Sequence, residues 1–162
     1  MGERQRILDL MDRAYKKEAW HGPALLETLK GVNAPLAAKR PPHGAHSIWE
    51  LVEHVASWNE LVAKRLEGRK ITYTPEYNFP PVPKNPSPAA WKKSRARLAR
   101  TQAHFRREVA RFPVAKLGRL RPSPPGQKAQ SWNVLIHGQI QHGLYHAGQI
   151  AMLRRMFRKP IA

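Results

Sequence analysis

The stretch SIWELVEHVASWNELV, residues 47–62, carries the clearest helix signal in the chain. Ser47 and Glu50 have the residue types and spacing of a capping box, in which each side chain accepts a hydrogen bond from the other residue's backbone N–H. The apolar residues after them recur every three or four positions, the period of a helix with one buried face. We therefore expect a helix over about 47–67, stopped by Gly68. Its buried stripe would consist of Ile48, Leu51, Val52, Val55, Trp58, Val62 and Leu66.

Three more segments have the helical period, over about 3–19, 87–111 and 130–157. Ser87 and Pro88 suit the N-cap and first turn of the second of these helices. Its buried side would consist of Trp91, Leu98, Phe105, Val109 and Phe112. A short helical piece, ALLETLK, precedes Gly31.

The segments between these helices are rich in proline. NAPLAAKRPPHGAH, residues 33–46, reads as a connection, and residues 68–86 contain too many prolines for a helix. The second of these either closes over a functional site or packs on a partner subunit. A further irregular segment covers 112–128, and no stretch alternates with period two. The predicted fold is all-α: one domain, 1–162, forming a four-helix bundle with long crossover loops.

Composition limits the chemistry that the chain can support. Its 162 residues include no cysteine, which excludes disulfides and thiolate ligands, so a metal site must use imidazole, carboxylate and water. No apolar run approaches the roughly 18 residues needed to cross a bilayer. The N-terminus shows neither a signal peptide nor a lipidation motif. We expect a cytoplasmic protein without a membrane partner.

The formal charge of +18 is concentrated in residues 91–111 and 153–159. Such a positive field attracts polyanions without sequence preference. The aromatic interleaving and recognition-helix patterns of dedicated nucleic-acid binders are absent. Solvated helix faces are therefore the favoured interpretation, and a nucleic-acid partner is the less favoured alternative.

The segment HGLYHAGQI, residues 142–150, places His142 and His146 four positions apart. In a helix both side chains project from one face, separated by a rise of about 6 Å. His54 lies in line with the apolar positions of its own helix and should face the bundle interior. Burying three unpartnered imidazoles would cost about 1–3 kcal/mol each, whereas a shared divalent ion would satisfy all three. Spacing alone leaves ordinary core or surface histidines as an interpretation that is at least as good.

Several polar residues are weaker candidates for a role beside these histidines. Gln139 and Gln149 lie near the same helix face and could orient an imidazole or a bound water. His46 and His21 lie in loops and could serve as a second layer around a site or contact a substrate. Glu50 could act as a base, but the capping box already explains it. The remaining histidines are not candidates. His43 is predicted to lie in a loop, His104 among arginines on the surface, and His137 on another face of the last helix.

Gly138, Gly143 and Gly148 occupy the predicted last helix, where each costs up to about 1 kcal/mol relative to alanine. Two structural reasons would explain why glycine is kept at these positions. Either neighbouring helices approach closely, or space is left beside the histidines for a ligand.

Three blocks of sequence resemble the DinB-like (DinB/YfiT) family of metal-binding four-helix proteins. They are AWHGPALLETLKGV from Ala19, HSIWELVEHVASWN from His46 and QHGLYHAGQIAMLRR from Gln141. The resemblance implies that His54, His142 and His146 form a three-histidine site for a divalent ion, most often nickel or zinc, with the remaining positions open to water. It also implies a bundle with non-sequential helix order and a homodimer.

The resemblance does not fix an activity. Some members of the family transfer or isomerise small-molecule substrates with a low-molecular-weight thiol such as bacillithiol, mycothiol or glutathione, and others are described as metal-dependent hydrolases. Our first interpretation is a metal-dependent enzyme, either a thiol-dependent S-transferase or a hydrolase, with catalytic residues unassigned. The alternative is a non-catalytic, stress-related protein with a structural metal and a basic surface that binds nucleic acid or another polyanion. A vestigial, empty site is a third interpretation.

Overall fold

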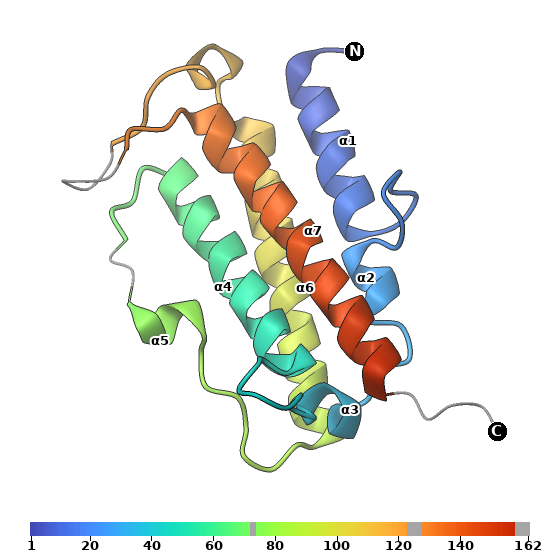
Figure 1. The fold of residues 1–162 in the computed structure, drawn as a ribbon. Helices are drawn as coiled ribbons and strands as arrows, with labels where there is room; N and C mark the ends of the chain where they lie inside the picture. The colour runs from blue at the N-terminus through green and yellow to red at the C-terminus, as the bar shows by residue number, and fades with distance from the viewer. Residues whose placement is uncertain (72–73, 123–127, 158–162) are drawn as a thin grey trace.

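The computed structural model describes residues 1–71, 74–122 and 128–157 (Figure 1). Within these ranges the chain forms seven α-helices and no strand, which confirms the predicted all-α class. The helices are α1 (Glu3–Tyr15), α2 (Leu25–Thr28), α3 (Ala34–Ala38), α4 (Ile48–Leu66), α5 (Pro75–Asn78), α6 (Pro88–Arg111) and α7 (Trp132–Phe157), with a 3-10 turn at Val114–Lys116.

The four long helices α1, α4, α6 and α7 form the bundle (Figure 1). Helix α4 packs against α6 and α7, and α1 packs against the same two helices, so sequence neighbours are not always neighbours in space. Long connections join α4 to α6 and α6 to α7. The predicted four-helix bundle with long crossover loops is therefore confirmed.

Two clusters of buried apolar residues fill the bundle, one centred on Trp49 and Ile150 and the other on Leu61 and Phe105. Three buried or half-buried polar side chains, Asn59, Gln102 and Gln139, also join α4, α6 and α7. The Gln139 amide donates to Asn59 Oδ1 at 2.8 Å, and Asn59 Nδ2 donates to Gln102 Oε1 at 3.0 Å. The predicted role of Gln139 beside the imidazoles is therefore wrong, because its side chain completes this buried amide chain instead.

Helix caps fix the starts of α4 and α6 where the sequence predicts them. Ser47 Oγ accepts from the Glu50 N–H at 3.2 Å, and Glu50 Oε2 accepts from the Ser47 N–H at 2.8 Å. Ser87 Oγ accepts from the Ala90 N–H at 3.2 Å. These bonds satisfy backbone donors that the first turn leaves free. The predicted buried faces are confirmed, except that Trp58 and Leu66 are only half-buried.

Helix α1 is shorter than predicted and ends at Tyr15 rather than near residue 19. Glu18 adopts a φ of 63°, in the left-handed region that a right-handed helix cannot continue through. Its carbonyl accepts a hydrogen bond from the Arg13 guanidinium instead.

Two short helices, α3 and α5, lie in segments that we predicted to be irregular. In each, a side chain caps the first turn and a proline sits within that turn: Asn33 caps the Leu36 N–H, and Thr74 caps the Tyr77 N–H. Proline disrupts a helix interior, but the first turn does not need its missing N–H. The prolines therefore begin these helices rather than exclude them.

Candidate metal centre

The three predicted histidines meet between α4 and α7. His54 Nε2 and His146 Nε2 each lie 2.9 Å from His142 Nε2. His54 and His146 are buried, with 5% and 6% of their surface exposed, and His142 is half-buried. One nitrogen from each ring lies within 4.8 Å of the other two, so the group could hold a metal ion.

The outer partners of two rings determine which nitrogen carries the proton. His54 Nδ1 lies 2.7 Å from the Asn78 carbonyl oxygen, which only accepts, so Nδ1 is the donor and Nε2 keeps its lone pair. His146 Nδ1 lies 2.6 Å from Gln149 Oε1 and is a donor for the same reason. The predicted contact between Gln149 and an imidazole is confirmed. Both rings thus aim a lone pair at the same point.

His142 is the ring between these two lone pairs. Its Nδ1 is buried and has no hydrogen-bond partner among the described residues. Without a cation, its Nε2–H can donate to only one of its two neighbours, and the other lone pair stays unsatisfied. A divalent ion accepts electron pairs from all three Nε2 atoms at once, so the donor set fits zinc or nickel.

The protein environment keeps the rings neutral. Burial lowers the pKa of His54 to about 4 and that of His142 to about 3, and burial also lowers the pKa of His146. Neighbouring imidazoles contribute to the lowered pKa of His54 and His142, because like charges would repel. Neutral imidazole is the form that binds metal, so the triad is ready to bind an ion at pH 7.

Aromatic rings surround the triad, and one of them comes from the proline-rich segment 68–86. Phe79 stacks on His54 with ring centres 4.2 Å apart. Trp58 meets His54 and His142 at an angle, and Tyr145 lies 5.1 Å from His146. Helix α5 lies beside α4 (Figure 1). Two residues of this segment, Asn78 and Phe79, therefore contact a histidine of the triad.

The sequence model that describes the DinB superfamily matches residues 19–150 of the chain, a span that includes all three histidines. The chain belongs to the DinB superfamily. Neither the curated proteins nor the solved structures yielded a match to this sequence. Over the described residues, the DinB-superfamily chain has no helix of sufficient length and apolar character to cross a membrane.

The remaining candidates from the sequence lie outside the triad. Glu50 completes the cap of α4 and pairs with Arg40, which confirms its structural interpretation. His46 stacks on the other face of Phe79, with ring centres 3.7 Å apart, and its Nδ1 lies 3.9 Å from Glu50 Oε2. His46 therefore belongs to the surroundings of the triad. His21 is exposed in the α1–α2 connection, and none of its described contacts involves the triad.

The three glycines of α7 do not mark a close helix contact within this chain. A Cβ built on Gly138, Gly143 or Gly148 would meet nothing within 4 Å. The interpretation that neighbouring helices of the chain approach closely is therefore wrong, and the space beside these glycines is open.

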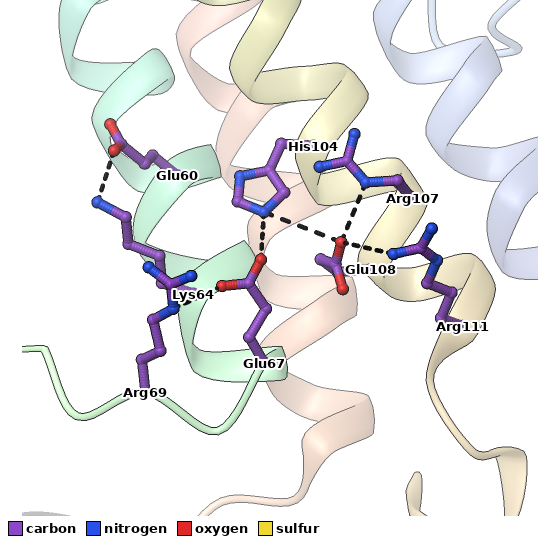
Figure 2. Close-up of polar contacts among 8 residues, drawn as sticks. All are labelled: Glu60, Lys64, Glu67, Arg69, His104, Arg107, Glu108 and Arg111. Atoms are coloured by element: carbon purple, nitrogen blue, oxygen red, sulfur yellow. Dashed lines mark hydrogen bonds and ion pairs between the residues drawn. The ribbon is translucent and has the colours of Figure 1, made fainter.

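A second group with metal-binding residue types joins the end of α4 to α6 (Figure 2). His104 Nε2 lies 2.6 Å from Glu67 Oε1 and 3.9 Å from Glu108 Oε1. The sites predicted from the sequence do not include this group, although His104 and Glu108 stand four residues apart on one helix. Arginines already pair with both carboxylates: Arg69 with Glu67, and Arg107 and Arg111 with Glu108.

Proposed function

We propose that this DinB-superfamily protein is a metal-dependent enzyme whose divalent ion is held by His54, His142 and His146. The observation that supports the proposal is the convergence of three Nε2 atoms, two of them fixed as acceptors by outer partners. The low pKa of the buried rings supports it as well, since no proton competes strongly for the site near neutral pH. Zinc and nickel suit three imidazole ligands.

An ion held by three imidazoles keeps open positions, where it lowers the pKa of a bound water or thiol or polarises a substrate. The residues of the chain supply the rest of the site. The Asn78 carbonyl and the Gln149 amide orient two of the rings. Phe79 and Trp58 shield the rings from water. We propose transfer of a low-molecular-weight thiol to a small-molecule electrophile, or hydrolysis of such a substrate.

Elemental analysis tests the metal part of this proposal. Wild type and His142→Ala would be purified without chelators and compared for bound nickel and zinc. We expect one ion per wild-type chain and none in the variant. A wild-type protein that carries no stoichiometric metal would contradict the proposal and support a vestigial site.

Turnover assays then separate the two reactions. Metal-loaded protein would be incubated with electrophilic substrates, with and without glutathione, bacillithiol or mycothiol. Turnover that requires a thiol indicates the transferase, and turnover in water alone indicates the hydrolase. Loss of either activity in His142→Ala, with the fold retained, would assign it to the metal centre.

A polyanion-binding function is the second candidate, and the outer face of α6 favours it. Lys92, Lys93, Arg95 and Arg100 are exposed there and take part in no ion pair within the described part of the chain. Affinity for DNA or RNA should then fall steeply with log salt and with replacement of these cations, yet remain unchanged in His142→Ala. Affinity that is absent at low salt would exclude this function.

We also propose that the protein forms a homodimer through the outer face of α7. Residues 129–153 carry no Lys, Arg, Asp or Glu in a chain with a formal charge of +18. Two such chains can approach with least repulsion through an uncharged face. The exposed residues of that face are Val134, Gly138, Gln141, Tyr145, Gly148 and Met152.

Sedimentation of wild type and Met152→Arg tests this arrangement. The variant places a charge on a self-matching surface, so we expect a dimer to become a monomer. Leu10→Arg, at an exposed position of α1, is the control and should stay dimeric. A monomeric wild type would contradict the proposal.

A further inference from the structure

Asn78, the last residue of α5, makes two hydrogen bonds to α4. Its backbone carbonyl accepts from His54 Nδ1–H at 2.7 Å. Its side-chain Oδ1 accepts from Trp58 Nε1–H at 2.9 Å. His54 and Trp58 stand four residues apart on one face of α4, so a single residue of α5 bridges both side chains.

We propose that Asn78 is a positioning residue of the metal centre. Its side chain, held by Trp58, places the carbonyl that fixes the tautomer and the direction of His54. This inference rests on the proposed metal-binding function. Outer partners of this kind hold a ligating histidine in the tautomer and orientation that the ion needs, and their loss typically weakens metal binding 10–100-fold.

The Asn78 side chain matters because α5 has few bonds of its own. The helix has four residues, and its local hydrogen bonds join Thr74 and Pro75 to Tyr77, Asn78 and Phe79. A single turn of this length is not stable in isolation. Contacts with α4 must therefore hold it in place, and the Asn78–Trp58 bond is a polar contact of this kind made by the Asn78 side chain.

Helix α4 also offers a matched control for this bond. Trp49, on the same helix, donates its indole N–H to Ser94 Oγ at 2.8 Å. Ser94→Ala and Asn78→Ala each remove a side-chain acceptor from an indole and leave the backbone in place. The two variants differ in location, because Trp49 lies in the apolar cluster and Trp58 lies against His54 and His142.

The test is the affinity for Zn²⁺, measured by competition with a chromophoric chelator. We expect Asn78→Ala to bind zinc about 10–100-fold more weakly than wild type. Asn78→Asp keeps an oxygen that can accept from Trp58 and should restore wild-type affinity. Ser94→Ala should also keep wild-type affinity, even where thermal unfolding shows that it has lost stability.

Wild-type zinc affinity in Asn78→Ala would overturn the inference while leaving the proposed metal site intact. An equal loss in Ser94→Ala would overturn it too, because general loosening of the bundle would then explain both results. Absence of zinc binding in wild type would instead contradict the proposed function on which the inference rests. Thermal unfolding of the chelated proteins checks that Asn78→Ala retains its fold.

Discussion

The His54–His142–His146 triad and the Glu67–His104–Glu108 group look alike by residue type and distance. Each joins α4 to a neighbouring helix, and each brings three ligand atoms within 4.8 Å of one another. Their surroundings differ. The triad is mostly buried and packed among aromatic rings, whereas Glu67 is exposed and arginines pair with both carboxylates (Figure 2).

The two groups differ in whether their electron pairs already have partners within the protein. In the triad, two Nε2 lone pairs face one Nε2–H, and a cation is what would satisfy them. In the network, His104 already donates to Glu67, and the arginines already neutralise the carboxylates. A divalent ion would have to displace these partners to bind there. Four predictions test this comparison.

The largest expected effect is on metal content. His142→Ala removes the nitrogen that both other rings face, so we expect the bound ion to be lost. His104→Ala removes the only nitrogen ligand of the second group and should leave the metal content unchanged. Elemental analysis of both variants checks this. Loss of metal from His104→Ala alone would reverse the comparison.

Metal binding should also stabilise the fold. At a free ion concentration 100 times Kd, mass action adds about 2.7 kcal/mol to the free energy of unfolding. For a chain of this size that corresponds to a rise of roughly 5–10 °C in Tm. Calorimetry with and without chelator should show this rise in wild type and in His104→Ala. Its persistence in His146→Ala would place the stabilising ion elsewhere.

The metal-free protein should lose stability in mild acid. The pKa values of His54 and His142, about 4 and about 3, lie below the ordinary value of 6.5, so the unfolded chain binds protons that the folded chain does not. Stability therefore falls as pH drops from 6.5 toward 4, by up to about 1.4 kcal/mol per pH unit for each histidine.

The contribution of the ion-pair network to the free energy of unfolding should be lost at lower pH. The hydrogen bond from His104 lowers the pKa of Glu67 below 4.5, so its contribution is lost only beneath that value. Urea unfolding of chelated protein at pH 7, 6 and 5 measures the effect of the histidines alone, because all three pH values lie above the range in which Glu67 responds. His142→Gln should show a shallower slope than wild type, and an identical slope would show that the triad is not the source.

The smallest effect is expected for His104→Gln. Partly exposed ion pairs contribute about 0–1 kcal/mol, so the free energy of unfolding should change by about 1 kcal/mol or less. Urea unfolding at pH 7 measures it. A loss several times larger would show that the network, like the triad, is a buried structural centre.

Local signals made much of the fold predictable. The capping box at Ser47 and the Ser87–Pro88 pair fix the starts of α4 and α6 because caps act within one turn. The prolines of residues 68–86 predict an irregular segment, but Thr74 and Pro75 form the capped first turn of α5. Boundaries that depend on a single residue's φ, such as the end of α1 near Glu18, leave little trace in the sequence.

The site was predictable where helix periodicity determines it. The four-residue spacing of His142 and His146, and the inward position of His54, follow from the α-helical repeat. The role of Asn78 did not follow, because it depends on how the chain after α4 folds back to place α5 beside that helix. Gln139 failed for the same reason: its partner, Asn59, is 80 positions away.

Anomalous diffraction from crystals of the zinc- or nickel-loaded protein, collected at the metal's absorption edge, would locate the bound ion itself. We expect one peak about 2.0–2.1 Å from the Nε2 atoms of His54, His142 and His146, with no peak at Glu67, His104 and Glu108. A peak at the second group, or no peak at the triad in fully loaded protein, would contradict this expectation.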